Sequence, residues 1–368
     1  MLTILLYVFI AVTAIQILYY LLGFSQFAFA KTKKYPLKQH PVSVLICAKN
    51  EAENLKNFLP KIIKQDYPNF EIVLINDASY DDTLDVMEAF QEQHKNIKIV
   101  NVENNEAFWG NKKYALTLGI KASTHDHLLF CDADCTPKSN RWITSMSAHF
   151  SEKKKFILGY GAYKHKKHSL LNSLVRFETL LTAIQYFSYA KAGNPYMGVG
   201  RNLAYQKAEF FNHNGFMSHM NIKSGDDDLF INEAATKATT RIAFSEESHT
   251  VSIAPETFTE WFQQKRRHIS TVKHYKLKDQ FLLGLFYVTQ LLFWVLFLIL
   301  ICTLFQWKIV VCIFSIRILL QYIIYGLSAK KLKEQNLIFA IPFLEIVLIL
   351  FQLTIFITNK VSKPNHWK

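Results

Sequence analysis

Long apolar segments without charge lie at both ends of the chain. Residues 1–30 carry no charged side chain, and residues 280–307 contain no Asp, Glu, Lys or Arg. Two further apolar segments, residues 309–327 and 337–358, are each interrupted by a single charged residue. Because about 20 apolar residues cross the core of a bilayer, this pattern predicts one membrane span near the start of the chain and three near its end.

The two interrupted spans hold Arg317 and Glu345. A charge at membrane depth costs a few kcal/mol or more, so such residues usually pair or face a polar cavity. The two side chains therefore either pair with each other or lie near the protein–water boundary, where Arg extends its charged end outward and Glu is protonated or solvated. The sequence leaves both arrangements open.

Lysines beside the spans predict their orientation. Four lysines lie within residues 31–38 and three within residues 330–333, and positively charged loops stay in the cytoplasm. Residues 31–279 are therefore expected to form one cytosolic domain, followed by three spans within residues 280–358 and a tail, residues 359–368, whose three lysines argue for the opposite side. The first apolar segment, residues 1–30, is interpreted as an anchor, because it is too long for a signal peptide and lacks a basic start.

Short β-rich segments alternate with segments of helical spacing in the middle of the chain. The alternation with helices of about 10–15 residues predicts an α/β fold with a mostly parallel sheet covered on both faces. Ligands bind such sheets at the carboxyl ends of the strands, where Asp77 and Asp132 are expected to lie. The expected strands are residues 42–47, 71–75, 97–102 and 127–131.

The composition limits the class of partner. The chain of 368 residues has 42 Lys+Arg against 29 Asp+Glu, a formal net charge of +13. This excess suits a protein that lies on an anionic membrane surface and receives a polyanionic small substrate. Nucleic acid is not an expected partner, because no helix-turn-helix, zinc-finger or RNP pattern is present. Five scattered cysteines without a C-x-x-C pair favour a reducing compartment.

Two aspartates, Asp132 and Asp134, stand one residue apart directly after the fourth expected strand. Carboxylate oxygens at a strand end can bind a hard divalent cation, which keeps other positions for water and phosphate oxygens. A lone D-x-D is more often a turn or a solvated strand end. A second acidic turn around Asp77, after the neighbouring strand, makes a ligand site at this edge of the sheet the better interpretation.

These motifs resemble the family 2 glycosyltransferases, which are inverting enzymes of GT-A fold that take a sugar from a nucleoside diphosphate. The resemblance covers residues 42–270. Residues 44–51 resemble the family's opening strand and its A-x-N-E turn, which implies that Ala48, Asn50 and Glu51 line the donor site. Residues 74–79 resemble its second acidic turn, which implies that Asp77 holds the nucleotide base or ribose.

Two further segments resemble motifs of the same family. Residues 110–116 are similar to its G-K-x-x-A-L helix start, which implies that Lys112 lies near the donor. Paired lysines also occur on any solvated helix face. Residues 224–229 resemble the E-D or D-D motif, whose second acid is the general base, and the matching residue is Asp227. The run from Asp226 to Asp228 suits a base, because mutual repulsion raises a pKa, but also an ordinary acidic helix start.

Acceptor-side residues are implied by two more resemblances. Residues 198–204 resemble the G-x-x-x-A segment that lines the donor sugar and acceptor cleft, which places Gly200 and Asn202 there together with Asp226. Residues 261–268 are similar to the Q-x-x-R-W motif. This resemblance implies that Gln264 and Arg267 bind the donor. His268 stands in the position of the tryptophan, on the acceptor side.

The departure at His268 favours one or a few transfers over polymer synthesis, because the tryptophan is most typical of processive synthases. The basic residues at positions 265–267 can instead contact lipid headgroups beside the membrane.

The sequence thus predicts an inverting glycosyltransferase of GT-A fold in the bacterial inner membrane, with its catalytic domain in the cytosol. The expected donor is a nucleotide-diphosphate sugar, UDP-linked, used with Mg²⁺ or Mn²⁺ held by Asp132 and Asp134. The expected acceptor is a lipid or lipid-linked saccharide, because the domain is tied to the bilayer on both sides. Two alternatives stay open: a processive polysaccharide synthase of the same fold, and a non-catalytic membrane scaffold with a retired nucleotide-binding domain.

Overall fold

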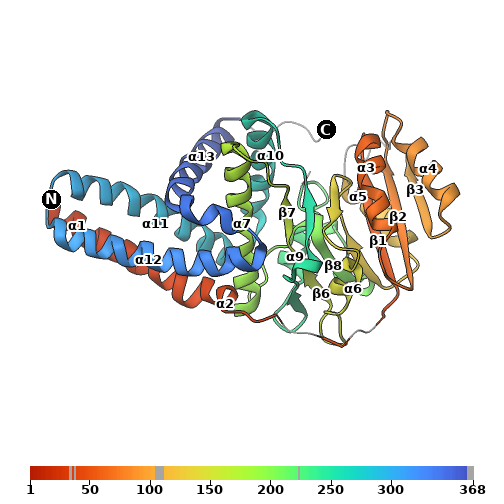
Figure 1. Cartoon of the computed structure of the whole chain (residues 1–368), viewed down its shortest axis with the longest axis horizontal. Helices are drawn as coiled ribbons and strands as arrows, with labels where there is room; N and C mark the ends of the chain where they lie inside the picture. Colours follow the sequence, from red (N-terminus) through yellow and green to blue (C-terminus); the bar gives the residue numbers. More distant parts are fainter. Residues whose placement is uncertain (33–34, 37–38, 104–111, 223, 363–368) are drawn as a thin grey trace.

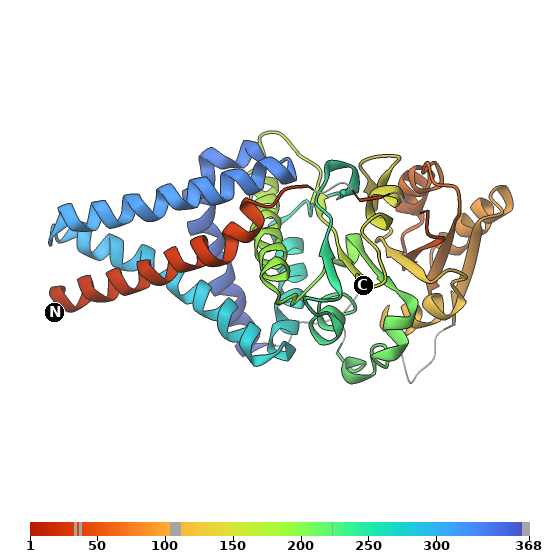
Figure 2. The same ribbon diagram turned by 90° about the horizontal axis from the view of Figure 1, so that it is seen from below.

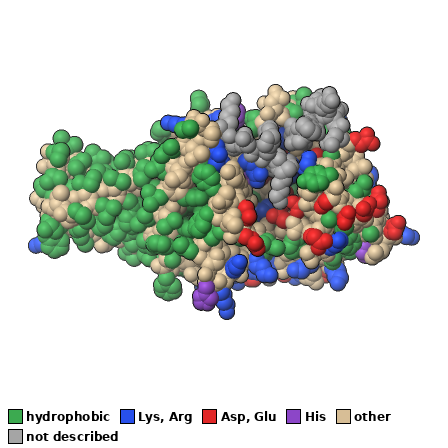
Figure 3. Space-filling model, turned by 90° about the horizontal axis from the view of Figure 1, so that it is seen from above, with side chains coloured by type: hydrophobic (Ala, Val, Ile, Leu, Met, Phe, Trp, Pro, Cys, Tyr) green, Lys and Arg blue, Asp and Glu red, His purple; other side chains and the backbone are tan. Residues whose placement is uncertain are grey.

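The computed structural model describes residues 1–32, 35–36, 39–103, 112–222 and 224–362. Long helices project from one end of the molecule and an α/β domain forms the other (Figure 1). Hydrophobic side chains cover the projecting helices almost completely, whereas charged side chains gather on the α/β domain (Figure 3). The distribution is that of a membrane protein with one water-facing domain.

Four helices of the described chain are long and apolar enough to cross a membrane, one at the start and three at the end, as the sequence predicts. The first is continuous but contains a π-helical stretch, and the last begins with a 3₁₀ turn. Their bounds are α1 Leu2–Leu18, the π-helix Tyr19–Phe24 and α2 Ser25–Ala28; α11 Leu277–Cys302; α12 Trp307–Leu332; and the 3₁₀ segment Gln335–Ala340 with α13 Ile341–Val361.

A seven-stranded sheet in the order β3-β2-β1-β4-β8-β6-β9 forms the centre of the α/β domain. The four expected strands are all present and pair in parallel, which confirms the mostly parallel α/β fold. The strands of this sheet are β1 Val42–Ala48, β2 Phe70–Asp77, β3 Ile97–Val102, β4 His127–Phe130, β6 Phe156–Leu158, β8 Leu203–Gln206 and β9 Thr240–Ile242. A second sheet, in the order β5-β10-β7, contains β5 Cys135–Pro137, β7 Gly161–Tyr163 and β10 Thr250–Ser252.

The extension of the main sheet beyond β4 is not predicted by the sequence. β8 runs antiparallel to both β4 and β6, and β6 and β9 are parallel to each other. These three strands have three or four residues each. A segment that short shows too few alternations of apolar and polar residues to indicate a strand.

Helices cover both faces of the main sheet. Alternate side chains of one strand point to opposite faces, and in β1 apolar side chains are buried on both faces. Val44 and Ile46 of β1 belong to a core cluster with residues of α3 and α6, whereas Leu45 belongs to the cluster that contains α5 and α7. The helices of this domain are α3 Ala52–Ile63, α4 Thr83–Gln93, α5 Lys112–Ala122, α6 Trp142–Ser147, α7 Leu170–Ala192, α8 Lys207–Asn212, α9 Asp228–Ala234 and α10 Phe258–Thr271, with 3₁₀ turns at Gly200–Asn202, Met217–His219, Glu246–Ser248 and Val272–His274.

Helix α7 lies at the junction between the membrane helices and the α/β domain (Figures 1 and 2). It packs against α2, α12 and α13 and also against β7 and β9. Its apolar residues from Leu171 to Tyr189 are mostly buried, so the helix is an internal element that joins the two parts.

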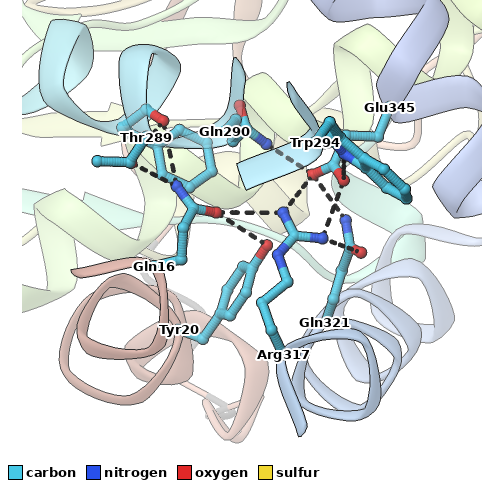
Figure 4. Close-up of polar contacts among 9 residues, drawn as sticks. Gln16, Tyr20, Thr289, Gln290, Trp294, Arg317, Gln321 and Glu345 are labelled. Atoms are coloured by element: carbon cyan, nitrogen blue, oxygen red, sulfur yellow. Dashed lines mark hydrogen bonds and ion pairs between the residues drawn. The ribbon is translucent and has the colours of Figure 1, made fainter. Parts of the chain in front are cut away.

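Arg317 and Glu345 form an ion pair inside the membrane bundle (Figure 4). The Arg317 Nη1 and Nη2 atoms donate to the two Glu345 oxygens at 2.9 and 2.8 Å. Gln290, Trp294 and Gln321 also donate to this carboxylate, at 2.7, 2.9 and 2.8 Å. Of the two arrangements that the sequence leaves open, the structure contains the paired one.

Candidate active site

A cavity opens at the carboxyl ends of β1 and β4, the edge where a parallel sheet is expected to bind its ligand. Apolar side chains of both strands form its floor. Its polar wall is formed by charged side chains of three separate segments and by the backbone of a 3₁₀ turn. These polar residues are Lys112, Asp132, Asp226, Asp227 and Gly200.

Lys112, the first residue of α5, bridges two of these carboxylates. Its Nζ lies 2.9 Å from Asp132 Oδ1 and 3.3 Å from Asp226 Oδ2. Burial alone would lower the pKa of Lys112, but the two carboxylates raise it well above its usual value. The ammonium therefore stays charged and can neutralise phosphate oxygens at this edge. The residues before α5, 104–111, which include Gly110 of the same motif, lie outside the described residues.

Asp227 caps the start of α9, next to this lysine. Its Oδ2 accepts a hydrogen bond from Gly200 N at 2.6 Å, and its Oδ1 accepts one from Asp228 N at 2.7 Å. Burial, with the neighbouring carboxylates of Asp226 and Asp228, raises the pKa of Asp227 to about 8. A carboxylate with a pKa near neutrality can accept a proton during a reaction and release it afterwards.

Helix α9, which carries this aspartate at its cap, is fixed to the membrane-proximal helices by two buried polar contacts. Asp228 Oδ2 accepts from Thr271 Oγ1 at 2.5 Å and from Tyr275 OH at 2.7 Å. Asn232 Nδ2 donates to Asp279 Oδ2, on the first turn of α11, at 2.9 Å. The position of Asp227 is therefore set by the contact between the α/β domain and the membrane bundle.

Asp132 and Asp134 approach each other just after β4. One ligand atom of each, with the Cys135 thiol, lies within 4.8 Å of the others. Burial and the charge of Asp132 raise the pKa of Asp134, and Arg201 lowers it. Burial also raises the pKa of the Cys135 thiol well above its usual value, so this group stays protonated. Two carboxylates beside a neutral thiol fit a hard divalent cation of the Mg²⁺ or Mn²⁺ type.

Four donor-side residues of the sequence prediction, Ala48, Asn50, Glu51 and Asp77, lie at the ends of β1 and β2 or just after them. Asp77 ends β2; its side chain is buried, and its Oδ2 has no hydrogen-bond partner among the described residues. Burial raises the pKa of Asp77. Ala48 ends β1, and Asn50 N donates to Ser79 Oγ at 3.0 Å, which joins the two turns. Glu51 follows at the cap of α3.

Asn202, which the sequence places on the acceptor side, lies in the core and does not line the cavity. Its Oδ1 accepts from Trp142 Nε1 at 3.1 Å. Its Nδ2 donates to the carbonyl oxygens of Tyr160 and Ser248 at 2.9 and 2.6 Å. The side chain thus holds three segments together, whereas the backbone of the neighbouring Gly200 reaches the cavity.

Gln264, Arg267 and His268 lie on α10, outside the residues that line the cavity. Gln264 Oε1 is buried and has no hydrogen-bond partner within the described residues. Burial lowers the pKa of Arg267. His268 is exposed. The end of α10 approaches the site through Thr271, which donates to Asp228.

The two other basic residues of this motif bind within the protein. Lys265 Nζ forms an ion pair with Glu178 of α7 at 2.5 Å. Arg266 donates to Asn359 Oδ1 at 2.8 Å and to the carbonyl oxygen of Ser362 at 2.7 Å. These contacts fix α10 between α7 and the end of α13.

Arg201 acts on the candidate metal site through its charge, and it is not among the residues that the sequence predicts. Its guanidinium lies 4.2 Å from the centre of the Tyr163 ring, and its Nη1 donates to Ser252 Oγ at 3.3 Å. Its charge lowers the pKa of Asp134. In the sequence, Arg201 is recognisable only as a basic residue between Gly200 and Asn202, the two positions assigned to the acceptor cleft. Its proximity to the aspartates depends on the second sheet, β5-β10-β7.

The fold of the whole chain is similar to that of a solved glycosyltransferase. The structure of the mannosyltransferase PcManGT from Pyrobaculum calidifontis, in complex with GDP-Man and Mn2+, superposes with a TM-score of 0.59 at 16% identity. The superposition covers 95% of this chain and 99% of that one, including the membrane helices.

Residues 43–216 match the model of glycosyl transferase family 2. A poly-beta-1,6-N-acetyl-D-glucosamine synthase of Staphylococcus epidermidis is 33% identical over 93 residues, 25% of this chain and 21% of the relative. An uncharacterized glycosyltransferase of Haemophilus influenzae is 33% identical over 122 residues, 33% of this chain and 36% of the relative. The chain thus matches about a fifth to a third of the length of these relatives. Residues 43–216 are thus similar to glycosyl transferase family 2, and four apolar helices lie at the two ends of the described chain.

Proposed function

We propose that the protein is an inverting glycosyltransferase that moves one sugar from a nucleotide-diphosphate donor to a lipid or lipid-linked acceptor. The observation that carries this proposal is the meeting of Lys112, Asp132, Asp226 and Asp227 in one cavity of a domain similar to glycosyl transferase family 2. These groups come from three separate segments of the chain, and together they supply a cation for phosphate and a carboxylate for proton transfer.

The donor lies along the carboxyl ends of β1, β2 and β4 in this proposal. The unpartnered Asp77 oxygen accepts a hydrogen bond from the base or ribose, beside the turn that holds Ala48, Asn50 and Glu51. Lys112 neutralises the diphosphate. Asp132 and Asp134 would hold Mg²⁺ or Mn²⁺, which stabilises negative charge on a leaving diphosphate when bound.

Asp227 acts as the general base. Its carboxylate takes the proton of the acceptor hydroxyl, whose oxygen forms a bond to the anomeric carbon while the bond from that carbon to the diphosphate oxygen breaks. A single displacement inverts the configuration at the anomeric carbon. The hydrogen bond from Gly200 N keeps the Asp227 carboxylate in place, and Asp226 lies beside it on the acceptor side.

The attachment of α9 to the membrane bundle supports a lipid-linked acceptor. Thr271 and Tyr275, which hold Asp228, lie just before the first C-terminal membrane helix. An acceptor headgroup at the bilayer surface is therefore close to the base. On this proposal Gln264, Arg267 and His268 of α10 contact the diphosphate or the acceptor, and the domain faces the cytosol of a bacterial cell.

The family resemblance implies a UDP-linked donor, whereas the solved structural relative binds GDP-Man. Both nucleotides therefore belong in the first experiment. Processive polymer synthesis is the second candidate function, because the Staphylococcus epidermidis relative is a polysaccharide synthase. Single transfer is the stronger proposal, because His268 stands in the position of the tryptophan that is most typical of processive synthases.

The experiment uses the full chain in nanodiscs, Mn²⁺, labelled UDP- and GDP-sugars, and a bacterial lipid extract as acceptor. We expect label from one donor to enter the lipid fraction, with a product one sugar longer. The matched variants are Asp132→Asn and Asp85→Asn, the latter on the exposed face of α4. Loss of transfer in Asp132→Asn but not in Asp85→Asn supports the proposal. Formation of a long polymer favours the second candidate. If no donor gives either transfer or nucleotide release, both candidates are contradicted.

A further inference from the structure

A second cavity, of about 240 Å³, lies between the segment that follows the first membrane span, the end of α7 and strand β9. Five cationic side chains line it, and no carboxylate of the described residues does. The cationic residues are Lys31, Lys154, Lys191, Lys237 and Arg241. The segment that carries Lys31 runs from α2 past α7 to the α/β domain (Figure 2).

This cavity is separate from the candidate active site, because it lies along β9, an outer strand of the sheet, and shares no lining residue with the first cavity. β6 runs in the same direction as β4, since both are antiparallel to β8, and β9 is parallel to β6. The lining contains Lys154, which precedes β6, the whole of β9, and Phe244 and Ser245 after it, so the second cavity runs along β9. The candidate active site lies at the carboxyl ends of β1 and β4.

The charge of Arg241 acts on two other titratable side chains of the second cavity. Burial, followed by the charge of Arg241, lowers the pKa values of Lys154 and His149, the latter to about 4. Lys154 Nζ donates to the carbonyl oxygen of Lys237 at 2.8 Å. Like charges without a counter-charge destabilise one another, and an anion in the cavity would relieve this repulsion.

The guanidinium of Arg241 is fixed for binding. It lies 4.3 Å from the centre of the Tyr35 ring, and its Nη1 donates to the carbonyl oxygen of His149 at 3.0 Å. Two polar atoms of the wall, Thr240 Oγ1 and His149 Nδ1, are buried without a hydrogen-bond partner in the described residues. A fixed guanidinium beside unpartnered polar groups is suited to phosphate oxygens.

The position of this cavity places it next to the membrane surface. Phe244, in its wall, packs against Phe27 of α2 at 5.4 Å between ring centres, and Phe27 packs against Phe187 of α7 at 5.0 Å. The wall is therefore continuous with the last turn of the first membrane span. Both a phospholipid headgroup and a soluble phosphate compound can reach such a position.

We propose that this cavity, lined by Lys31, Lys154, Lys191, Lys237 and Arg241, is a binding site for a phosphate-bearing anion, distinct from the donor site. The ligand would contain a phosphate group and carry more than one negative charge in total. Either anionic phospholipid headgroups or a free polyphosphate can supply this chemistry. The proposal does not depend on the proposed function, because it concerns binding in a separate cavity.

Two probes distinguish the sources, both with the full chain and EDTA to remove divalent metal. The first is inorganic pyrophosphate added to protein in phosphatidylcholine nanodiscs, with binding measured by calorimetry. The second is native mass spectrometry of protein from vesicles that contain phosphatidylglycerol and phosphatidylcholine, with the retained lipid counted. We expect at least one probe to bind, and which one binds identifies the source.

The variant Lys237→Gln/Arg241→Gln should weaken that binding about tenfold or more, because two charged contacts are lost. The control Lys121→Gln/Lys153→Gln removes the same charge from exposed positions outside the cavity and should bind as the parent does. A second variant, Lys191→Gln/Lys237→Gln, retains the stacking of Arg241 on Tyr35. It tests the same loss of charge if the first variant does not fold, and it should also weaken binding. Binding of neither probe, or equal loss in the control, overturns the proposal.

Discussion

Two clusters of partly or fully buried charge in this protein satisfy their side chains to very different degrees. In the membrane bundle, the Glu345 carboxylate accepts five hydrogen bonds, two of them from Arg317 (Figure 4). In the cavity of the α/β domain, the ammonium of Lys112 bridges Asp132 and Asp226, while Asp227 next to it carries a raised pKa. Both oxygens of the Glu345 carboxylate are occupied by protein donors, whereas the second cluster leaves capacity for a ligand.

The difference shows what each cluster does. A buried ion pair is tolerated when further hydrogen bonds accompany it. The Arg317–Glu345 pair joins α11, α12 and α13, and Gln16 of α1 accepts from Arg317 Nη2 at 3.1 Å. Its role is therefore to hold the membrane helices in register. Carboxylates with perturbed pKa values in a cavity are instead typical of a reactive site.

The largest effect is expected for Asp227→Asn. The change removes the proton acceptor while it keeps the shape of the side chain, so transfer should fall about 10²–10⁴-fold. Donor affinity should change little. Single-turnover transfer with labelled donor measures the rate, and Asp85→Asn is the matched control. A rate equal to that of the parent would contradict the assignment of the base.

The opposite outcome is expected for Glu345→Ala. It leaves Arg317 buried without its partner, which should destabilise the protein by about 3–5 kcal/mol. Transfer per folded molecule should stay at the parent level, because the cluster does not touch the cavity. Thermal unfolding in nanodiscs measures the loss, and Arg317→Leu/Glu345→Leu should recover much of it. If the double variant were as unstable as Glu345→Ala, the argument from the unpaired charge would be wrong.

The pH dependence separates the clusters as well. Because the base must be deprotonated and the pKa of Asp227 is raised to about 8, kcat/KM should rise with pH, at most about tenfold per pH unit, and level off above that value. Stability has the opposite sign. An acid whose pKa is raised in the folded state stabilises that state at low pH, and this contribution is lost as the pH rises through about 8.

Asp227→Asn is the control for this prediction, since it should flatten the change in stability between pH 6 and pH 9 in the absence of metal. Denaturant unfolding at each pH gives the measurement. An unchanged slope in Asp227→Asn would show that another group titrates.

The smallest effect is expected for Tyr275→Phe. It removes one of the two hydroxyl groups that donate to Asp228, a loss of about 0.5–1.5 kcal/mol. Because α9 then holds Asp227 less firmly, kcat should fall several-fold with little change in the donor KM. Tyr67→Phe, which loses a hydrogen bond to the carbonyl oxygen of His40, is the control. Equal effects of the two changes would remove the special role of the α9 contact.

Much of the fold could be predicted from the sequence, because its signals are strong. The membrane helices show as long uncharged segments, and β1 to β4 show as apolar strands in regular alternation with helices. The antiparallel β8 could not be predicted in the same way, because its position between β4 and β6 depends on long-range pairing.

The position of a candidate site residue could be predicted where the residue follows a strand, but not where tertiary contacts determine it. Asp77 and Asp132 lie at the strand ends that the pattern indicates. Asn202 resembles a site residue by its motif, yet its amide is used to bind core backbone and an indole N–H. Arg201 reaches the aspartates only through the second sheet, which no local pattern reveals.

The most direct test is to locate the bound metal. Crystals of the full chain with Mn²⁺ and a nucleoside diphosphate would be measured by anomalous diffraction at the manganese edge. The account predicts one strong peak between the carboxylates of Asp132 and Asp134, with diphosphate oxygens beside it and Lys112 in contact with them. A peak held by other residues, or a nucleotide bound away from the carboxyl ends of β1 and β4, would contradict it.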